Sequence, residues 1–305
     1  MMKPAATTPP TVGLIGLGSM GYGMAQSLIR AGLATHGFDI DPGREKKLHA
    51  EGGRPGALAD VAGALGIVVV VVVTAAQTEA VLFGPDGLAP RLHAGAVVLG
   101  CATVSPDFAR AIEARLGELG VLYLDAPISG GSVKAAAGKL SIMASGTPEA
   151  FAAAQPALDA MAETVFRLGD AAGAGSAMKV VNQLLAGVHI AAAAEAITFG
   201  MTQGVDPKAI VEVISKCAGT SWMFENRGPH IAAGDYTPHS AVDIFVKDLG
   251  IVSDIARAAR FAAPLTATAL QQFVAASGAG HGREDDSAVA KIYARNAGLT
   301  LPKAE

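Results

Sequence analysis

The stretch VGLIGLGSMGYGMAQSL, Val12–Leu28, decides the fold of this 305-residue chain. Its apolar start, Val12–Ile15, is typical of a buried strand, and the spacing of apolar residues in Ser19–Arg30 predicts a helix. Three glycines in the pattern G-x-G-x-x-G lie between them: Gly16, Gly18 and Gly21. Such glycines allow a tight turn and a close backbone approach, and the first N–H groups of a helix bind phosphate. The stretch therefore predicts a dinucleotide-binding unit.

An acidic residue downstream supports this interpretation. Asp39 lies near the end of the next expected strand, Thr35–Ile40, 18 residues after Gly21 and close to the usual spacing of about 20. A carboxylate there pairs with the ribose 2′-hydroxyl of NAD and repels the 2′-phosphate of NADP. We therefore predict NAD, with NADP as an alternative because Arg44 is near in sequence; Asp39 as a simple helix N-cap is the other alternative. The predicted cofactor residues here are Gly16, Leu17, Gly18, Ser19, Met20, Gly21 and Asp39.

Strand-like and helix-like segments alternate along the first half of the chain. The further expected strands are Val68–Val73, Gly95–Leu99, Val121–Leu124, Ser141–Ala144 and Thr164–Leu168. This alternation predicts an α/β fold with a doubly wound parallel sheet of the Rossmann type.

The pattern changes after Gly169. One long proline-free helix is expected over Ser176–Gly204, and the remaining segments have helical spacing. We therefore predict an all-α domain built on a long interdomain helix. The expected boundaries are a flexible tail over 1–11, a Rossmann NAD-binding domain over 12–172, and a helical substrate and oligomerisation domain over 173–305. The glycines at 169, 173 and 175 are expected to act as hinges.

Composition excludes several classes of protein. Hydrophobic residues make up 51% of the chain and charged residues 16%, with a net charge of −4 and no basic stripe, which argues against disorder and against nucleic acid as a partner. Two cysteines are too few for a disulfide framework. The first ten residues lack the apolar core of a signal peptide, and the longest apolar run is far shorter than the ~20 residues of a membrane span. We expect a cytoplasmic protein with no membrane partner, and the histidines show no metal spacing, so no metal is expected.

The segment APISGG, residues 126–131, points to a ligand. It follows an expected strand, at the end where open α/β sheets bind their ligands. Ser129 offers a hydroxyl, and Gly130 and Gly131 expose backbone N–H groups, so the turn can hold a carboxylate without a net charge. The alternative is a plain loop.

A lysine opens the long helix. Lys179 lies near the helix N-terminus, where the helix dipole and apolar neighbours favour a neutral amine, as a general base requires. Asn182 and Gln183 follow at the spacing that shares its helix face. The alternative is a lysine that lies along a surface between domains.

Read together, these segments resemble the β-hydroxyacid dehydrogenase family. The matching segments follow one another in the family's order over nearly the whole chain: GLIGLGSMGYGMA, DAPISGG, GAGSAMKVVNQ, KDLGI and GHGREDDSAVAKIY. The resemblance is closest to the L-threonate dehydrogenases, through SWMFENR and DYTPHSAVDIFVKDLG, which are expected to line the substrate pocket. It implies an NAD-dependent oxidation of a small hydroxy acid in carbohydrate metabolism.

The resemblance also implies roles for individual residues. Ser129, Gly130 and Gly131 hold the substrate carboxylate, and Lys179 is the catalytic acid/base. Asn182 and Gln183 compete for the role of orienting amide. The remaining implied cofactor residues are Thr74, Thr103, Lys247 and Asp248. The stretch Gly100-Cys101-Ala102 before Thr103 departs from the more polar sequence of many relatives, and Cys101 is expected to be a small buried residue.

Three alternatives stay open at this stage. The substrate could be another hydroxy acid, such as 3-hydroxyisobutyrate, glycerate or 4-hydroxybutyrate. An imine reductase is disfavoured because those relatives usually replace the lysine found here as Lys179. A dinucleotide-binding regulator without turnover belongs to a different class. We also expect a homodimer or homotetramer, because the long apolar helix would expose surface in a lone subunit.

Overall fold

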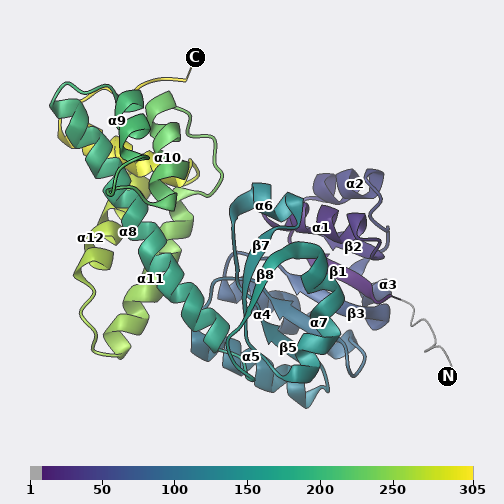
Figure 1. Ribbon diagram of the computed structural model, residues 1–305. Helices are drawn as coiled ribbons and strands as arrows, with labels where there is room; N and C mark the ends of the chain where they lie inside the picture. The colour runs from purple at the N-terminus through teal and green to yellow at the C-terminus, as the bar shows by residue number, and fades with distance from the viewer. Residues whose placement is uncertain (1–8, 305) are drawn as a thin grey trace. The chain divides into compact units, whose positions relative to one another are not determined.

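The computed structural model describes residues 9–304 and divides into two compact units between Lys179 and Val180 (Figure 1). Most of the predicted tail, residues 1–8, lies outside the described part of the chain. The boundary falls inside the long helix rather than in the glycine-rich segment before it, because the first residues of that helix are bonded to the first unit.

A five-stranded parallel sheet forms the centre of the first unit, as the sequence predicts. Its strand order is β2-β1-β3-β4-β5. The strands are β1 (Thr11–Ile15), β2 (Thr35–Phe38), β3 (Leu65–Val70), β4 (Val97–Gly100) and β5 (Leu122–Asp125). Because all five are parallel, the segments that follow them lie along one edge of the sheet. Strands β3 and β4 are almost wholly buried, which explains their continuous apolar sequence.

Helices alternate with these strands. They are α1 (Gly21–Arg30), α2 (Pro42–Ala50), α3 (Leu58–Val61), α4 (Ala75–Phe83), α5 (Pro106–Glu118), α6 (Gly131–Ala137) and α7 (Pro148–Met161). Several begin with a short polar N-cap followed by proline, as at Ser105-Pro106 and Thr147-Pro148. The cap side chain accepts a backbone N–H of the first turn, and proline fits the position whose own N–H would have no helical partner.

The segments around 141–144 and 164–168 are strands, but they do not extend the main sheet. They form β7 (Leu140–Ala144) and β8 (Ala162–Arg167) of a separate sheet with the order β6-β7-β8, where β6 is Ile128–Ser129. The chain leaves β5 and pairs antiparallel with β7 two residues later, which ends the main sheet at β5. The predicted parallel sheet is confirmed, and these two predicted strands lie outside it.

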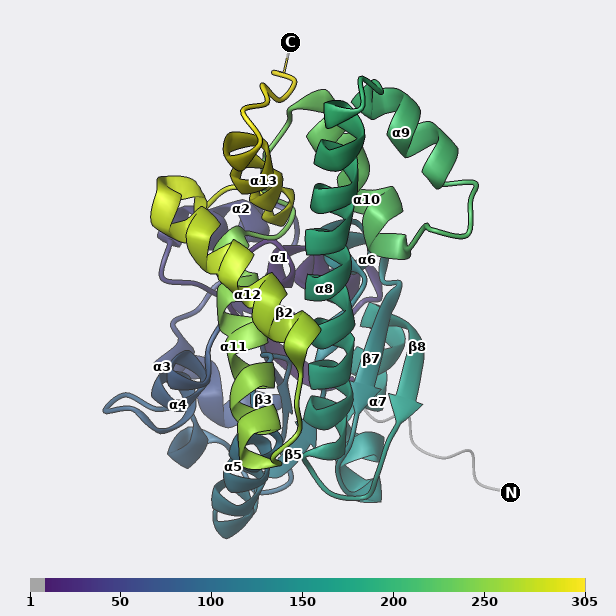
Figure 2. The ribbon, with the colours of Figure 1, turned by 90° about the vertical axis from the view of Figure 1, so that its left-hand side faces the viewer.

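The second unit is built from helices. Helix α8 (Ala174–Thr202) enters it from the first unit and is followed by α9 (Pro207–Ile214), α10 (Trp222–Ala233), α11 (Val242–Ala258), α12 (Pro264–Ala276) and α13 (Ala290–Asn296). Figure 2 shows α8 and α11 side by side, and a side chain at Gly187 would collide with Leu249. Helix α10 was missed in the sequence because Gly228 and Pro229 interrupt its pattern.

Helix α8 is long and apolar enough to cross a membrane by length and mean hydropathy alone. The core helix of a water-soluble protein meets the same criterion. Its polar side chains Ser176, Lys179 and Gln183 are buried within the protein, where each donates a hydrogen bond. Ile190, Ala194 and other residues of its later turns lie in the core of the second unit, and 39% of the apolar stretch is buried.

Candidate active site

The glycine-rich loop after β1 has the shape that dinucleotide binding requires. Gly16 has a φ of +96°, and a Cβ there would lie 2.4 Å from the carbonyl oxygen of Val71. A Cβ at Gly21 would lie 1.9 Å from the carbonyl oxygen of Gly16. At Gly18 the nearest atom would be 3.9 Å away, so the backbone is open where a ligand would approach. Two glycines therefore form the turn, and the third leaves room for a phosphate.

The other predicted residues of this loop divide between core and surface. The side chains of Leu17 and Met20 pack in the core of the first unit, while Ser19 is exposed. The backbone N–H of Leu17 donates to Oδ2 of Asp39 at 2.6 Å. That N–H is therefore used within the protein, and the loop is tied to the end of β2.

Asp39 lies directly after β2, beside the glycine-rich loop. Its Oδ1 accepts the N–H of Asp41 at 2.9 Å, and the guanidinium of Arg44 lies 3.5 Å from its Oδ2. The N-cap of α2 is Asp41, so the alternative that Asp39 is a simple cap does not hold. The structure thus places the Asp39 carboxylate directly after β2, with the guanidinium of Arg44 next to it.

Two threonines follow the neighbouring strands at the same edge of the sheet. Thr74 comes after β3 and caps α4 in a capping box with Gln77, and half-buried Thr103 comes after β4. Cys101 is buried, as expected, and burial together with nearby Asp125 raises the pKa of its thiol to about 12. Such a thiol stays protonated and is no nucleophile.

Lys179 lies against the small-residue turn. Its Nζ donates to the carbonyl oxygen of Ile128 at 2.8 Å, and the lysine is only 8% exposed. Ile128 immediately precedes Ser129, which is half-buried, while Gly131 is exposed with open space at the position of a Cβ. The structure thus brings together two features that are 50 residues apart in the sequence: the amine of Lys179 and the turn Ser129–Gly131.

The predicted amides and the KDL segment meet in the second unit. Gln183 Nε2 donates to Asp248 Oδ2, and Gln183 Oε1 accepts from Asn182 Nδ2 at 2.9 Å. Lys247 Nζ lies 2.6 Å from Asp248 Oδ1. Gln183 and Asp248 are buried, whereas Asn182 is half-buried. Gln183 is thus held by two side chains, and Asn182 is the more accessible amide.

Asp125, at the end of β5, is a residue that the sequence analysis missed. Its carboxylate is fully buried and accepts the backbone N–H groups of Gly173 and Ser176, at 2.9 and 2.8 Å. It therefore caps α8 from the main sheet. The available signal was an acid directly after the buried run LYL, but its partners are about 50 residues away. Gly173, expected to act as a hinge, is instead held by this bond.

Comparison with known proteins identifies the family. Residues 11–169 match the NAD binding domain of 6-phosphogluconate dehydrogenase, and residues 173–293 match the family described as NAD-binding of NADP-dependent 3-hydroxyisobutyrate dehydrogenase. The chain is 55% identical over 296 residues to an L-threonate dehydrogenase of Cupriavidus necator. This match covers 96% of this chain and 99% of that protein. The chain belongs to the β-hydroxyacid dehydrogenase family. Its first unit is an NAD-binding domain.

Other relatives of this dehydrogenase carry two different names. An L-threonate dehydrogenase of Escherichia coli K12 is 48% identical over 96% of this chain and 97% of that protein. A crystal structure from Salmonella typhimurium, titled 3-hydroxyisobutyrate dehydrogenase, is 51% identical with a TM-score of 0.89 and covers 92% of this chain and 99% of that one. A curated 3-hydroxyisobutyrate dehydrogenase of Pseudomonas aeruginosa is only 33% identical, over 92% of this chain and 98% of that protein.

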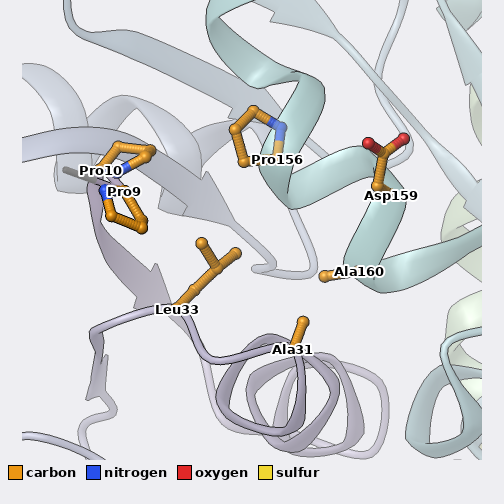
Figure 3. A pocket seen from close by; sticks show the side chains of 7 residues that line it. All are labelled: Pro9, Pro10, Ala31, Leu33, Pro156, Asp159 and Ala160. Atoms are coloured by element: carbon orange, nitrogen blue, oxygen red, sulfur yellow. The ribbon is translucent and has the colours of Figure 1, made fainter. Parts of the chain in front are cut away.

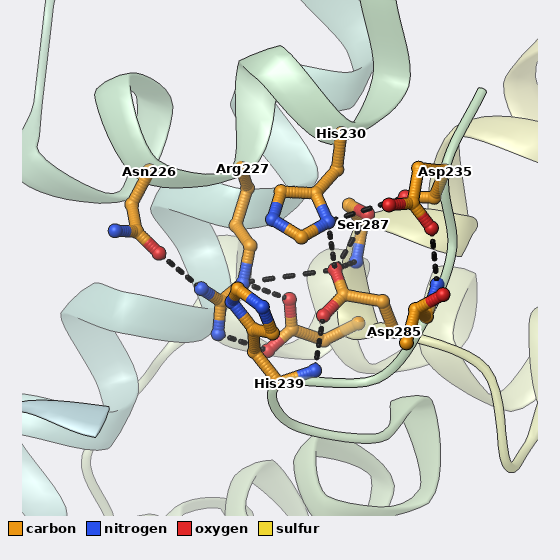
Figure 4. Close-up of polar contacts among 9 residues, drawn as sticks. Asn226, Arg227, His230, Asp235, His239, Asp285 and Ser287 are labelled. Carbon is orange, nitrogen blue, oxygen red and sulfur yellow. Dashed lines mark hydrogen bonds and ion pairs between the residues drawn. The ribbon is translucent and has the colours of Figure 1, made fainter. Parts of the chain in front are cut away.

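The second unit of this dehydrogenase contains a buried ion pair (Figure 4). Arg227 Nε donates to Asp286 Oδ1 at 2.5 Å, and Asp285, also buried, caps the next turn by accepting from Ser287. Asp285 is the N-cap of the short helix Asp286–Val289. Asp286 pairs with the guanidinium of Arg227, and the buried Asp285 carboxylate accepts the backbone N–H groups of His239 and Ser287.

The segment SWMFENR was expected to line the substrate pocket, and three of its residues lie elsewhere. Met223 and Phe224 are buried in the core of the second unit, and Arg227 is buried in the ion pair. Trp222 is the exposed aromatic residue of this segment. A role in the pocket therefore stays a prediction for the other four residues of the segment, Ser221, Trp222, Glu225 and Asn226.

The ion pair predicts a pH dependence of stability. Burial raises the pKa of Asp286 to about 6, although Arg227 opposes the rise. In the unfolded chain the pKa of this carboxyl is 3.8, so the folded chain holds the proton more tightly. The contribution of Asp286 to the free energy of unfolding therefore falls as the pH rises from about 4 to 6. The rise in the pKa of Asp286 corresponds to a loss of about 3 kcal/mol in the free energy of unfolding across this pH range.

Asp286→Asn cannot titrate and isolates this effect. The wild-type chain is expected to exceed the variant in free energy of unfolding by more at pH 4.5 than at pH 7, because the ionised carboxyl is costlier to bury than the neutral one. Urea unfolding of both proteins at pH 4.5, 5.5 and 7 measures the difference. If the stability difference between wild type and variant instead grows with pH, the attraction of Arg227 lowers the pKa of Asp286 by more than burial raises it.

A separate pocket of the first unit carries no chemistry for this reaction (Figure 3). Its lining residues are Pro9, Pro10, Ala31, Leu33, Pro156, Asp159 and Ala160. Pro10 directly precedes β1, so the pocket lies at the amino end of that strand, and the glycine-rich loop lies at the carboxyl end. The residues predicted to bind cofactor and substrate in the first unit follow the carboxyl ends of its strands.

Proposed function

We propose that this protein oxidises L-threonate to 2-oxo-tetronate with NAD. Five curated relatives that are 48–55% identical over nearly the full length are L-threonate dehydrogenases, which supports this substrate over 3-hydroxyisobutyrate. The observation that carries the reaction type is the buried amine of Lys179 beside Ser129. The test is NAD-dependent turnover of a panel of hydroxy acids that includes L-threonate and 3-hydroxyisobutyrate.

The turn after β5 is the proposed carboxylate site. Ser129 supplies a hydroxyl donor. Gly130 and Gly131 have φ values of +135° and +77°, and because they lack side chains, their backbone N–H groups are open to a ligand. A larger residue at Gly131 would occupy space that is open in the structure. Neutral donors bind a carboxylate without attracting every anion, which suits a small hydroxy acid.

Lys179 is the proposed acid/base. The Ile128 carbonyl accepts one hydrogen bond from its amine and fixes the amine next to the turn. In the oxidative direction the amine accepts the proton of the substrate hydroxyl, and in the reverse direction the ammonium returns it. Placing the acid/base and the carboxylate site on adjoining backbone fixes which carbon of the substrate lies near the amine.

Asn182 is the proposed orienting amide, and Gln183 its support. The two follow Lys179 on α8 at the spacing of one helical turn. Gln183 has its amide engaged on both sides, by Asp248 and by Asn182, whereas half-buried Asn182 keeps its carbonyl oxygen for a substrate hydroxyl. Lys247 and Asp248 stay proposed cofactor residues, and Asp248 also holds Gln183.

The residues after the first four strands fit NAD. The open backbone at Gly18 suits a pyrophosphate, the Asp39 carboxylate suits the ribose hydroxyls, and Thr74 and Thr103 are proposed to lie near the nicotinamide half. When bound, NAD supplies the hydride acceptor for the oxidation. The chain binds and orients the two reactants and moves the proton.

Replacing Asp39 by alanine tests the choice of cofactor. We expect NAD affinity to fall about tenfold, because the ribose and the N–H of Leu17 both lose a charged acceptor. Relative affinity for NADP should rise, since Arg44 loses one of its two carboxylate partners, keeps Asp41 at 3.4 Å, and can pair with a 2′-phosphate. Titration calorimetry with both cofactors measures this. The control is the double variant Asp39→Ala, Arg44→Ala, in which the increase in relative NADP affinity should disappear. Unchanged NAD affinity in Asp39→Ala would refute the ribose contact.

A regulator without turnover is the alternative from another class. The buried lysine, the carboxylate turn and the amide pair are all present, and a protein that only senses a dinucleotide needs none of them. NAD binding with no turnover of any hydroxy acid would favour the regulator.

We further infer a cytoplasmic homo-oligomer, a homodimer or homotetramer. Large apolar side chains of α8 are exposed in the lone chain: Met178, Val181, Leu185 and Phe199. Such a surface is usually covered by a partner, and most oligomers of water-soluble proteins are symmetric assemblies of one chain. Light scattering after size-exclusion chromatography measures the subunit number, and a monomer at micromolar concentration would contradict this.

A further inference from the structure

The carboxylate of Asp125 lies at the junction of three backbone segments of the first unit. Besides the two backbone N–H groups of α8, it accepts the Ser176 hydroxyl at 2.7 Å and the Ser145 hydroxyl at 3.3 Å. The Ser145 hydroxyl in turn accepts the N–H of Gly175 at 2.9 Å. Burial raises the pKa of the Asp125 carboxyl, and all of these partners donate to it and oppose that rise, because donated hydrogen bonds favour the ionised form.

No space separates the first turn of α8 from the two sheets of the first unit. A Cβ at Gly175 would lie 2.4 Å from the carbonyl oxygen of Met143 and 2.8 Å from that of Asp125. Met143 belongs to β7 and Asp125 ends β5, so the helix starts against backbone on both sides. Its position relative to the turn after β5 is therefore set by close contact and by the buried cap together.

Asp125 and Lys179 connect the same two segments at two points. Asp125 binds α8 at Ser176, and one turn later Lys179 binds back to Ile128, three residues after Asp125. A shift of the helix start would move the amine away from Ser129. The negative charge at the helix N-terminus also offsets the positive end of the helix dipole near the amine.

We propose that Asp125 is a positioning residue for Lys179, holding its amine beside the carboxylate turn and setting the charge that it experiences. This rests on the acid/base role of Lys179 proposed above. Titratable groups near Asp125 include the Cys101 thiol and the Tyr123 phenol, and burial raises the pKa of both, so they stay protonated and neutral. The Glu113 carboxylate lies near Tyr123 and accepts the N–H of Ala172 at 3.0 Å.

The test compares Asp125→Asn with the wild-type protein. The asparagine has the same shape but must turn an NH₂ group toward N–H donors, so the helix start loosens and the charge is lost. We expect kcat for hydroxy-acid oxidation to fall about tenfold or more, as for a misplaced catalytic group. The acid limb of the kcat–pH profile should move to lower pH by roughly one unit, because a nearby anion no longer favours the ammonium form. NAD affinity should stay within twofold.

Thr147→Ala is the matched control for a lost helix cap. Thr147 caps α7 in the same unit, accepting the N–H of Ala150 at 3.2 Å, and none of its hydrogen bonds involves α8. Its loss should lower the melting temperature and leave kcat and its pH profile unchanged. If Asp125→Asn behaves like Thr147→Ala, Asp125 is a helix cap only and the proposal is overturned.

Ser176→Ala covers the case in which Asp125→Asn does not fold. It removes one hydrogen bond of 2.7 Å from the carboxylate and keeps both backbone bonds. A kcat reduced several-fold with NAD affinity intact supports the proposal, and a wild-type kcat overturns it. Lys179→Met separates the acid/base role of Lys179 from the positioning role of Asp125. If Lys179→Met has normal turnover, the acid/base assignment fails. If Lys179→Met is inactive and Asp125→Asn has normal turnover, only the positioning role fails.

Discussion

Replacing Lys179 by methionine is expected to lower kcat about 1,000-fold, within the range for loss of a positioned acid/base. Methionine keeps the length and apolar stem of the side chain, so α8 and its buried contacts stay in place. NAD affinity should remain within twofold, because the hydrogen bond of Lys179 goes to Ile128 in the turn after β5, where the substrate carboxylate is proposed to bind. Steady-state kinetics and titration calorimetry on the same preparation measure the two quantities.

Lys139→Met is the matched control, since Lys139 is an exposed lysine of the same unit. It should keep wild-type kcat and KM. Lys179→Arg completes the set, because arginine retains the positive charge but does not deprotonate at working pH. If Lys179→Met retains turnover within a few-fold of wild type, Lys179 is not the base. An active Lys179→Arg would show that charge alone is needed.

Alanine at Gly18 should abolish most NAD affinity without destabilising the fold. The new methyl group would have no neighbour closer than 3.9 Å, so the free chain tolerates it, but it fills the space that a pyrophosphate needs. We expect NAD affinity to fall about 100-fold, equal to nearly 3 kcal/mol. Calorimetric titration with NAD and a thermal melt without NAD measure both effects.

Gly16→Ala is the contrasting variant. Its Cβ would meet a backbone oxygen at 2.4 Å, at a φ of +96° that alanine rarely adopts, so both the melting temperature and NAD affinity should fall. Equal NAD affinity in Gly18→Ala and the wild type would place the pyrophosphate elsewhere. A melting temperature lowered equally by both substitutions would make the loss of binding a consequence of unfolding.

The local features of this chain could be predicted from its sequence. The strand–loop–helix at Val12–Leu28 is specified by residues next to one another, and so is the cap-and-proline start of several helices. Lys179 was found because its position at a helix start is unusual for a lysine. These inferences needed no knowledge of what lies far away along the chain.

The features that were missed depend on distant partners. The second sheet includes Ile128–Ser129, which pairs with β7, and a two-residue strand leaves no periodic signal. Asp125 and Ser176 are 51 residues apart, and Arg227 and Asp286 are 59 apart. An aspartate that caps a distant helix looks the same in sequence as one on a surface loop. Helix α10 had usable signals, the N-cap Ser221 and the terminal Gly234, which its internal proline obscured.

The first measurement is NAD reduction by the purified protein with L-threonate, D-threonate, 3-hydroxyisobutyrate, D-glycerate and 4-hydroxybutyrate, repeated with NADP. The account predicts that kcat/KM is highest for L-threonate with NAD, by about tenfold or more over each other acid, and that Lys179→Met loses this activity. Preferred turnover of 3-hydroxyisobutyrate would keep the proposed acid/base and contradict the substrate. No turnover of any acid, with NAD still bound, would contradict the enzyme itself and favour a dinucleotide-binding regulator.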